Sequence, residues 1–381
     1  MRNAKHILAI GLLICLSVFA CEVQPQETAE KPTPPNQDLS QLILPDGFEI
    51  SIYADSIENA RSMCMGPKGT LFVGTRTAGK LWAIQDKDGD YKADKVYLLA
   101  AGLNMPNGVA FRDGSLYLAE VSQITRYDDI ENKLDSPPIP VVVNDEFPTE
   151  DHHGWKYIAF GPDDKLYVPI GAPCNICYRP DDKRYASITR MNPDGSDLEV
   201  YAHGIRNSVG FAWHPETKAL WFTDNGRDWL GDDSPSDELN HAPEAGMHFG
   251  YPHCHAGDLL DAEFAENHLC EEFTPPVQKL GAHVAALGML FYTGDMFPPE
   301  FKNNLLICQH GSWNKSIPDG YRVSRVQLDG DKAIAHTPFV EGWLKDDEPW
   351  GRPVALLQLK DGSVLVSDDY GNRIYRITYQ N

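Results

Sequence analysis

The hydrophobic and polar positions of the chain repeat one pattern six times: an apolar strand, a tight polar turn and a second apolar strand. One such hairpin cannot bury both of its faces, whereas several hairpins packed around a common axis can. The pattern therefore predicts an all-β protein, a six-bladed β-propeller, whose functional loops converge at one end of the central channel. The six hairpins are expected at residues 62–75, 108–120, 157–171, 210–224, 288–309 and 355–369.

The two ends of the predicted propeller domain, residues 42–381, have the patterns of matching strands. Residues 48–55 (FEISIYAD) alternate as a half-buried strand does, and residues 372–379 (NRIYRITY) supply a second edge. We expect the first of these strands to join the last blade and close the ring. Residues 224–281 lack strand alternation. A loop of this length in a compact domain is usually functional, and a decorative loop is the alternative.

The first twenty residues have the pattern of an export signal. A positively charged start precedes an apolar run at 7–20, which is short for a membrane span, and Cys21 follows a small residue. These features predict a lipoprotein signal peptide at 1–20 with lipidation of Cys21. An ordinary signal peptide with an incidental cysteine is the alternative. The Pro-rich polar stretch at 21–41 predicts a disordered tether. The protein would then be exported, facing the periplasm or the cell exterior, and held at a membrane only by its lipid.

Export favours an oxidising compartment, in which cysteines form disulfides. Cys254 and Cys270 bracket a short loop, where we expect a disulfide. Cys174 and Cys177 form a C-x-x-C in a Pro-containing loop after a strand, which favours a structural disulfide over thioredoxin-like chemistry. A zinc site that combines this motif with a histidine is a lesser alternative, because the chain has no second C-x-x-C.

The charge of the chain limits its partners. The formal net charge is −22 at pH 7 and there is no basic stripe, which argues against binding to nucleic acid or anionic lipid. Residues 86–94 (DKDGDYKAD) resemble a calcium loop in their carboxylates at positions 1, 3, 5 and 9. However, Tyr91 replaces the glycine of position 6, and Tyr97 replaces the closing glutamate. A hairpin tip in which Asp and Gly only form the turn is the alternative.

Polar residues replace apolar ones at the strand ends that face the predicted channel mouth. These positions are 151–154 (DHHG), 204–210 (GIRNSVG), 224–228 (DNGRD), 310–315 (HGSWNK), Arg76 and Arg352. Several Arg and His residues in a strongly acidic chain predict one concentrated positive pocket. Because Arg pairs with carboxylates in a bidentate geometry, the pocket suits a ligand with several anionic groups.

The sequence resembles the soluble glucose/sorbosone dehydrogenase family over roughly residues 42–380. The likeness is carried by HHGWKYIAFGPDDKLYVPIG, GIRNSVGFAWHPETKALWFTDNGRD and GMLFYTGDMFP, and GAPCNIC, DNGRDWLGDD and QHGSWN are most similar to the sorbosone dehydrogenase-like branch. The resemblance implies a six-bladed propeller that uses pyrroloquinoline quinone (PQQ) and calcium to oxidise a sugar or a related alcohol or aldehyde by hydride transfer. Since no C-x-x-C-H haem motif occurs, a separate molecule would accept the electrons.

The resemblance also implies catalytic and cofactor-binding residues. His153 matches the general base that takes the hydroxyl proton, with His152 as the alternative if the register slips by one. Arg206 and Asn207 match the pair that holds the quinone carbonyls, where Arg206 would stabilise developing negative charge. Arg352 matches a cationic position that pairs with the carboxylates of PQQ.

A metal site is implied by the resemblance in the loop after the fourth hairpin. Gly226 and Arg227 match positions whose backbone carbonyls bind calcium, which would polarise the same quinone carbonyl. Asp237 and Glu238 match an acidic pair that either orients this loop or holds a second calcium.

The chain departs from the glucose-oxidising members of that family before its last hairpin. Trp350 stands where they carry the first Arg of an Arg-x-Arg. Lys315, His310 and Arg322 are candidates to replace their carboxylate-binding lysine, and Arg76 could compensate from another blade. His310 and Arg76 also resemble the cofactor-contacting His and Arg of fungal PQQ-dependent pyranose dehydrogenases.

Two other functions are compatible with a six-bladed propeller. A calcium-dependent lactonase or esterase needs central carboxylates and Asn around a catalytic metal, and has no need for several Arg. A non-catalytic propeller that binds a glycan has an aromatic, uncharged mouth, and Trp155, Trp229 and Trp313 keep that alternative open. Fold alone does not decide among the three functions.

Overall fold

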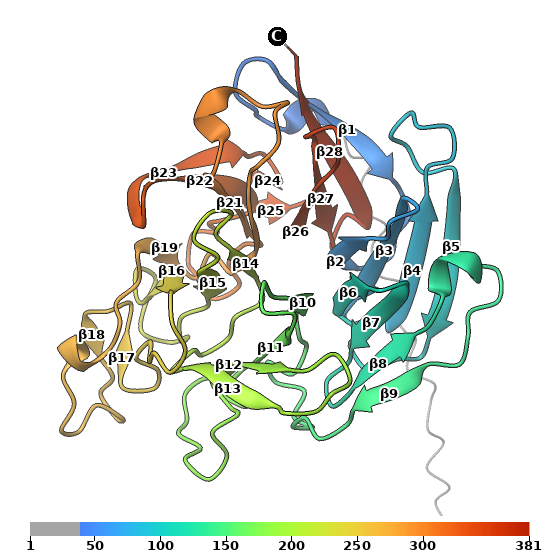
Figure 1. Cartoon of the computed structure of the whole chain (residues 1–381). Helices are drawn as coiled ribbons and strands as arrows, with labels where there is room; N and C mark the ends of the chain where they lie inside the picture. The colour runs from blue at the N-terminus through green and yellow to red at the C-terminus, as the bar shows by residue number, and fades with distance from the viewer. Residues whose placement is uncertain (1–38, 381) are drawn as a thin grey trace, which may run out of the picture. The chain divides into compact units, whose positions relative to one another are not determined.

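Six antiparallel sheets of four strands each form blades around a central axis (Figure 1). The computed structural model describes residues 39–380. The helical elements in this range are four 3-10 turns: η1 (Leu39–Gln41), η2 (Ile130–Asn132), η3 (Cys270–Glu272) and η4 (Pro299–Phe301). The fold is the six-bladed β-propeller that the repeated pattern predicts.

The strands of the first three blades pair in the order of the sequence. Blade 1 contains β2 (Ala60–Met65), β3 (Thr70–Thr75), β4 (Lys80–Gln85) and β5 (Lys95–Ala101). Blade 2 contains β6 (Gly108–Arg112), β7 (Ser115–Ala119), β8 (Ile124–Tyr127) and β9 (Val141–Asn144). Blade 3 contains β10 (Ala159–Phe160), β11 (Leu166–Ile170), β12 (Ser187–Met191) and β13 (Glu199–His203).

Among the last three blades, blade 4 contains an insertion, and blade 6 combines strands from both ends of the chain. Blade 4 contains β14 (Phe211–Trp213), β15 (Leu220–Asp224), β16 (Ser236–Ala242) and β19 (Gln278–Ala282). Blade 5 contains β20 (Ala286–Phe291), β21 (Leu305–Gln309), β22 (Arg322–Asp329) and β23 (Lys332–Val340). Blade 6 contains β26 (Pro353–Gln358), β27 (Val364–Asp368), β28 (Arg373–Tyr379) and β1 (Phe48–Ala54). Two small hairpins pair β17 (Cys254–His255) with β18 (Leu259–Leu260) and β24 (Leu344–Lys345) with β25 (Glu348–Pro349).

Each predicted hairpin forms the first two strands of one blade, from β2–β3 in blade 1 to β26–β27 in blade 6. The polar turns supply the backbone conformations that tight reversals need. In the first turn, Gly69 has a φ of +86° and the N–H of Gly66 donates to the carbonyl of Thr70 at 2.9 Å. The second strands β3, β11, β15, β21 and β27 are buried at every residue. Both of their faces are therefore covered, as the apolar pattern requires.

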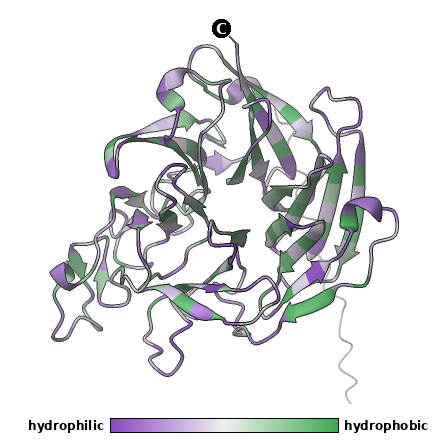
Figure 2. Ribbon diagram, in the orientation of Figure 1, coloured by the Kyte–Doolittle hydropathy of each residue, from purple (hydrophilic) through white to green (hydrophobic). Residues whose placement is uncertain are grey.

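Apolar side chains link neighbouring blades, and the strands nearest the central axis are largely hydrophobic (Figure 2). Between blades 1 and 2, Phe72 and Leu81 belong to the same buried cluster as Val109 and Leu118. Phe72, Leu81 and Leu118 are fully buried. Burying one side chain of this size contributes about 1.5–3 kcal/mol. Clusters of this kind recur around the ring and hold the blades together.

The predicted closure of the ring is confirmed. β1 pairs with β28 in antiparallel register, so that Ile50 lies opposite Ile377 and Phe48 lies opposite Tyr379. In Figure 1 the blue strand β1 lies beside the dark red strand β28. The first strand of the domain thus completes the blade made by the last three, and the ring closes through backbone hydrogen bonds and apolar contacts.

The predicted long loop of blade 4 contains more structure than expected. The expectation that it lacks strands is wrong for Ser236–Ala242 and Gln278–Ala282, which are the third and fourth strands of the blade. β16 buries Asp237 and Asn240, so polar side chains occupy positions where strands are usually apolar. This explains why the alternation was invisible. The insertion itself is residues 243–277, between β16 and β19.

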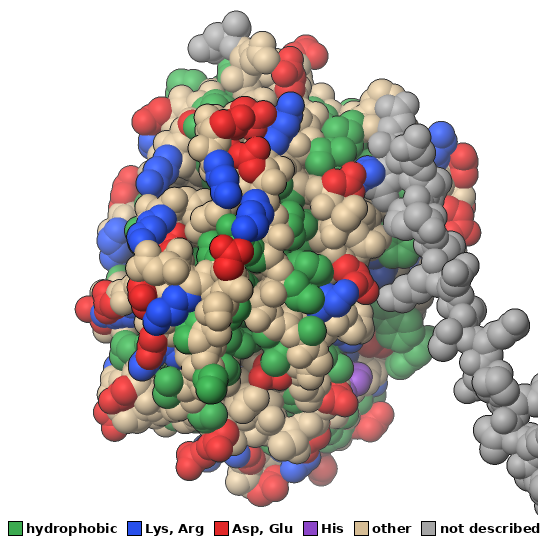
Figure 3. Space-filling model, turned by 90° about the vertical axis from the view of Figure 1, so that its right-hand side faces the viewer, with side chains coloured by type: hydrophobic (Ala, Val, Ile, Leu, Met, Phe, Trp, Pro, Cys, Tyr) green, Lys and Arg blue, Asp and Glu red, His purple; other side chains and the backbone are tan. Residues whose placement is uncertain are grey.

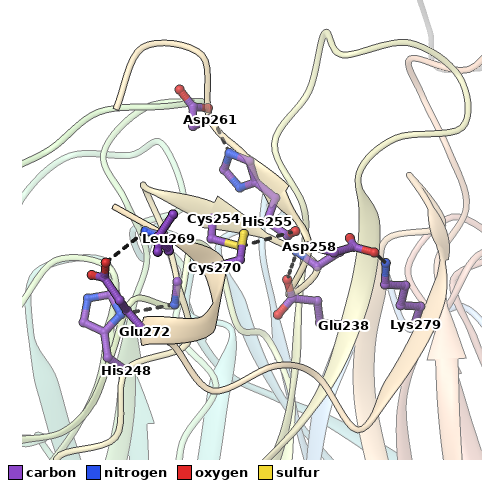
Figure 4. Close-up of a disulfide and its surroundings, with 12 residues drawn as sticks. Glu238, His248, Cys254, His255, Asp258, Asp261, Leu269, Cys270, Glu272 and Lys279 are labelled. Atoms are coloured by element: carbon purple, nitrogen blue, oxygen red, sulfur yellow. Dashed lines mark hydrogen bonds and ion pairs between the residues drawn. A yellow bond between two sulfur atoms is a disulfide. The ribbon is translucent and has the colours of Figure 1, made fainter. Parts of the chain in front are cut away.

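Both predicted disulfides are present, one between Cys174 and Cys177 and one between Cys254 and Cys270. The C-x-x-C is therefore a cross-link in this structure rather than a pair of zinc ligands. Figure 4 shows the second disulfide inside the insertion of blade 4.

The flank of the propeller in Figure 3 carries acidic and basic side chains side by side, with apolar groups between them.

The predicted signal peptide, the lipidated Cys21 and most of the predicted tether lie outside the described residues. Leu39–Gln41, at the end of the predicted tether, form η1. A helix with the length and hydropathy to cross a membrane is not found within residues 39–380.

Candidate active site

Strand ends from several blades meet at one end of the channel. In an antiparallel hairpin, the start of the first strand and the end of the second lie at the same edge. Residues that precede a first strand or follow a second strand therefore share one mouth. The predicted residues in such positions are Arg76 after β3, His153 before β10, Arg206 before β14, His310 after β21 and Arg352 before β26.

An ion network that the sequence analysis missed joins blades 1 and 6 at the mouth. Arg61 Nη1 lies 2.5 Å from Asp369 Oδ2, and Arg61 Nε donates to Asn107 Oδ1 at 2.7 Å. His310 Nε2 contacts Asp369 Oδ1 at 2.8 Å. Burial by itself raises the pKa of Asp369, but His310 and Arg61 outweigh burial and bring the pKa below its usual value. The charged carboxylate therefore holds His310 in place.

Arg76 places a cation beside this network. Its guanidinium lies 3.6 Å from the ring centre of Trp155. Burial and the charge of Arg61 lower the pKa of Arg76 to about 10, against the opposite effect of Asp369, so the side chain is cationic at pH 7. Its Nε is buried and has no hydrogen-bond partner within residues 39–380. A buried donor of this kind costs free energy unless a ligand accepts its proton.

His153 has the hydrogen bond and the environment of a neutral base. Its Nδ1 lies 2.8 Å from the carbonyl oxygen of Ala172 and must donate to it. Burial, the charge of Arg206 and the neighbouring His152 hold the pKa of His153 well below its ordinary value. The neutral ring therefore carries its proton on Nδ1 and keeps a lone pair on Nε2. A Cβ at Gly171 would lie 2.5 Å from the Cβ of His153, so this close approach requires glycine.

Arg206 is held by the loop between Cys174 and Cys177. Its Nε donates to the carbonyl of Asn175 at 2.8 Å, and its Nη2 donates to Asn175 Oδ1 at 2.9 Å. The same Nη2 lies 3.2 Å from Asp228 Oδ2. Asn175 Oδ1 also accepts the backbone N–H of Asp228 at 2.8 Å. One asparagine in a disulfide-closed loop therefore fixes the orientation of the guanidinium.

The backbone before β14 is fixed from the other side by Asp224. Its two carboxylate oxygens accept the N–H groups of Arg206 at 2.8 Å and of Asn207 at 2.6 Å. The Oδ1 of Asn207 lies near Gly171, and hence near His153, since a Cβ on that glycine would come within 3.2 Å of it. The structure thus brings His153, Arg206 and Asn207 into one neighbourhood.

Arg352 approaches the mouth from the start of blade 6. Its Nη2 donates to the carbonyls of Gly311 and Ser312 at 3.1 and 3.2 Å, and its charge acts on His310. Like Arg76, it has a buried Nε without a hydrogen-bond partner in the part of the chain that the structure describes. Two guanidinium groups at one mouth therefore have unused donors.

Two other predicted cations are paired with one aspartate. Lys315 Nζ lies 3.4 Å from Asp319 Oδ2, and Arg322 Nη2 lies 3.2 Å from Asp319 Oδ1. Arg322 also donates to Gln309 Oε1 at 2.5 Å. The structure uses these cations to hold the loop between β21 and β22.

The residues predicted for calcium form a buried network under the loop after β15. The N–H of Gly226 donates to Asp237 Oδ1 at 2.9 Å, while Glu238 Oε1 accepts the N–H of Ala256 at 2.7 Å. Arg227 pairs with the buried Asp261. Figure 4 shows Glu238 and, within the insertion, Asp261 joined to His255. Burial raises the pKa of Asp237 to about 6 and that of Glu238 to about 8. Asp237 thus orients the Gly226 loop directly.

The predicted calcium loop of blade 1, residues 86–94, connects β4 with β5. Asp86, Asp88 and Asp94 are the one set of three His, Cys, Asp or Glu side chains within residues 39–380 whose ligand atoms lie within 4.8 Å of one another. Asp86 accepts the N–H of Gly89 at 2.8 Å and that of Tyr91 at 2.9 Å, as a residue that forms a turn does. This loop lies away from the mouth, because β4 begins there and ends at the opposite edge.

Comparison with known proteins places the chain in a family. The family model described as TrAA12-like matches residues 42–380. The chain belongs to the TrAA12-like family. A curated relative in Borreliella burgdorferi, described as an uncharacterized protein, is 32% identical over 365 residues, which is 90% of this chain and 92% of the relative.

Solved structures similar to this TrAA12-like chain have the same fold at low sequence identity. The calcium structure of the Trichoderma reesei family AA12 enzyme has a TM-score of 0.77 at 19% identity and covers 89% of this chain and 97% of its own. The holo form of the pyranose dehydrogenase PQQ domain from Coprinopsis cinerea has a TM-score of 0.75 at 17% identity, with 91% and 98% covered. The PQQ-bound aldose sugar dehydrogenase from Streptomyces coelicolor has a TM-score of 0.64 at 20% identity, with 89% and 100% covered.

The mouth of this TrAA12-like propeller contains polar residues that sequence analysis did not single out, chiefly Arg61, Asn175 and Asp369, and it gives a contact with Arg206 to Asp228, which sequence analysis placed at the mouth without a role. Asp369 ends the sixth repeat, and Asp228 follows the fourth by four residues. Their position after buried second strands was a usable signal. Asn175 had no such signal, because nothing in a C-x-x-C predicts what its inner residues contact.

Proposed function

We propose that this TrAA12-like protein oxidises a sugar, or a related alcohol or aldehyde, with PQQ and calcium, and passes the electrons to a separate acceptor. Its structural neighbours include a pyranose dehydrogenase PQQ domain and a PQQ-bound aldose sugar dehydrogenase, which supports PQQ and a sugar substrate. The observation that carries the proposal is the pair of buried, unused Nε donors of Arg76 and Arg352 at the mouth that also holds His153.

The residues at the mouth fit a planar ligand with several anionic and carbonyl oxygens. Arg76 and Arg352 each offer a buried donor without a protein acceptor in residues 39–380. Arg206 and Asn207 lie beside His153 and would face the carbonyl oxygens, and His310 lies between Arg352 and the Asp369 network. Gly226 and Arg227 would hold the calcium through their backbone carbonyls, with Asp237 fixing the loop. When bound, PQQ supplies an electron-accepting quinone and calcium polarises it.

Within this arrangement, the residues of the chain bind, orient and accept a proton. His153 accepts the substrate hydroxyl proton at Nε2, which is free because Nδ1 is committed to the carbonyl of Ala172. Arg206 presents a fixed positive charge where negative charge develops, and Asn175 keeps its guanidinium from reorienting. Arg76 and Arg352 balance charge and orient the ligand.

The sequence likeness to the sorbosone dehydrogenase-like branch makes sorbosone one candidate substrate, and the glucose-type sugars are the others. The hydrolase alternative has less support, because the acidic set with metal-ligand spacing in residues 39–380 lies in the hairpin between β4 and β5 and not at the mouth. The dehydrogenase should reduce a dye when sugar is added, whereas a glycan-binding protein should not.

A single reconstitution tests the proposal. Purified protein is mixed with PQQ and Ca²⁺, and dye reduction is followed with glucose, sorbosone, pyranoses and polyols. We expect sugar-dependent reduction that needs both PQQ and Ca²⁺ and that EDTA abolishes. Binding of PQQ without turnover of any sugar, or no PQQ binding at all, would reject the function.

We also propose that the protein is exported and attached to a membrane through a lipid on Cys21. The two disulfides of the propeller support an oxidising compartment. Metabolic labelling with an alkyne palmitate analogue tests this proposal. Label should enter the natural chain and be lost from Cys21→Ser. Label retained in that variant would contradict the anchor.

A further inference from the structure

Two tryptophan rings stand exposed at the rim of the mouth. Trp229, in the loop between β15 and β16, is 69% exposed, and Trp313, in the loop between β21 and β22, is 65% exposed. Their ring centres lie 5.3 Å apart and the planes meet at 86°. Large aromatic side chains left in solvent together are unusual on a folded protein and mark a binding surface.

The residues next to the two rings in sequence form hydrogen bonds with the cluster at the mouth. Asp228, which precedes Trp229, contacts Arg206 through Oδ2 at 3.2 Å and accepts the Nδ2 of Asn314 through Oδ1 at 3.0 Å. Asn314 in turn follows Trp313. One carboxylate therefore connects Arg206 with the neighbours of both rings. The rings form the outer edge of the same site.

Trp229 is held in a strained backbone conformation. Its φ of +71° is a conformation that bulky residues rarely adopt. The loop is fixed on both sides, because Asn175 binds the N–H of Asp228 and His283 Nε2 contacts the carbonyl of Gly231 at 2.7 Å. Burial does not compensate for the strain, since most of the ring is in solvent. Strain that packing does not explain is typical of functional positions.

A buried polar atom between the rings and the mouth lacks a partner. Asn314 directs Nδ2 to Asp228, which fixes the orientation of its amide. Its Oδ1 is buried and finds no hydrogen-bond donor within residues 39–380. A ligand that lies on the rings and offers a hydroxyl at this point would satisfy Oδ1.

We propose that Trp229 and Trp313 form a saccharide subsite at the rim, which holds a second pyranose ring of a substrate whose reacting end lies at His153. A pyranose combines an apolar C–H face, which suits an indole, with hydroxyls that suit Asn314 Oδ1. The substrate class is then oligosaccharides or glycosides. This inference rests on the proposed function for the identity of the reacting end.

A docking protein is the less suitable occupant. Two aromatic side chains offer roughly 300–500 Å² together, whereas a stable protein interface buries about 800 Å² on each partner. The perpendicular arrangement of the rings also forms a corner that fits one compact ring better than a flat surface.

Binding to the full chain without PQQ tests the subsite independently of catalysis. Calorimetric titrations use cellotetraose, maltotetraose and xylotetraose, with glucose as the short control. We expect at least one tetrasaccharide to bind, and Trp229→Ala or Trp313→Ala to weaken it about tenfold, which is about 1.4 kcal/mol. Ile317→Ala is the matched control, because Ile317 is a 72% exposed apolar residue of the same loop without a ring.

Trp229→Gly separates binding from folding. Glycine removes the ring and relaxes the φ of +71°, so the melting temperature should stay the same or rise while tetrasaccharide affinity falls as in Trp229→Ala. A ring needed only for structure would lower the melting temperature instead. That result, with affinity unchanged, would overturn the subsite.

Turnover with a small dye acceptor completes the test. The Trp229 and Trp313 variants should raise KM for the tetrasaccharide about tenfold and leave KM for its monosaccharide within twofold. Equal KM values for natural and variant protein would overturn the inference even where dye reduction upholds the dehydrogenase. Absence of turnover with ring-dependent binding retained would reject the dehydrogenase and keep the subsite as a glycan-binding site. Failure of every tetrasaccharide to bind the natural protein would overturn the subsite.

Discussion

The channel mouth and the seam of blade 6 are built on opposite principles, although both join residues from the two ends of the chain. At the seam, Ile50 of β1 faces Ile377 of β28, and both strands contribute to one apolar cluster. At the mouth, Arg61 of blade 1 meets Asp369 of blade 6 as a buried ion pair beside His310. The seam buries apolar side chains, whereas the mouth buries charged ones.

The difference shows which region serves stability and which serves function. Apolar burial stabilises the ring directly. Buried donors without an acceptor, such as the Nε atoms of Arg76 and Arg352, lower stability unless something binds them. Such an arrangement is expected where a ligand supplies the missing acceptors. Substitutions in the two regions should therefore change different measured quantities.

The largest expected effect is on catalysis at the mouth. His153→Ala should lower kcat about 10²–10⁴-fold, the usual contribution of a general base, because the Nε2 lone pair is lost. The melting temperature should change little, since His153 contributes one hydrogen bond to the carbonyl of Ala172. Steady-state dye reduction and calorimetry measure the two quantities on the same preparation.

The control for this prediction is the neighbouring residue. His152 is exposed and should tolerate alanine with most of its kcat retained. If His152→Ala were inactive and His153→Ala active, the general base would be His152 and the predicted register would be off by one.

The seam should respond in the opposite way. Ile377→Ala should lower the free energy of unfolding by about 2–5 kcal/mol, the usual range for a buried isoleucine, because it leaves a cavity in a fully buried position. At 20 °C kcat should be unchanged. Denaturant unfolding measures the first quantity. A fall in kcat without loss of stability would show that seam and mouth are not separate.

The fold was predictable from sequence because each hairpin carries its own local signal. Six copies of an apolar pattern gave the blades, and residues 48–55 with 372–379 gave the closure. The strand at 236–242 was missed because three of its buried positions, Asp237, Glu238 and Asn240, are polar. Alternation identifies a strand only where the inner face is apolar.

The candidate site was predictable only in part, and for a related reason. Residue type and position at strand ends indicated Arg76, His153 and Arg352. Which cations are free is a matter of three-dimensional pairing, and sequence could not show that Asp319 engages both Lys315 and Arg322. Nor could it show that Asn175 holds Arg206, since that contact joins residues 31 positions apart.

A smaller effect should follow from loosening Arg206 without removing it. Asn175→Ala deletes the Oδ1 that accepts from Arg206 and from the N–H of Asp228. We expect kcat to fall about tenfold, about 1.4 kcal/mol, with KM changed less. The matched control is Asn192→Ala, since Asn192 bonds Ser196 and Asp197 in a turn of blade 3. Equal losses in both variants would mean that Asn175 has no positioning role.

The smallest expected effect is a shift of the pH profile, which measures how the neighbouring groups at the mouth act on the pKa of His153. His153 accepts a proton only when neutral, so activity should be lost as pH falls through its pKa in the folded protein. Burial, then Arg206 and then His152, lower that pKa, and the acid limb of kcat/KM should therefore lie below pH 6.5. His152→Ala removes one of these causes and should move the limb upward by a fraction of a pH unit. The seam variant Ile377→Ala should leave the limb in place, because it changes no charge near His153. A limb at or above pH 6.5 in the natural protein would show that the mouth does not keep this histidine neutral. The proposed contrast between a mouth built for proton transfer and a seam built for stability would then fail.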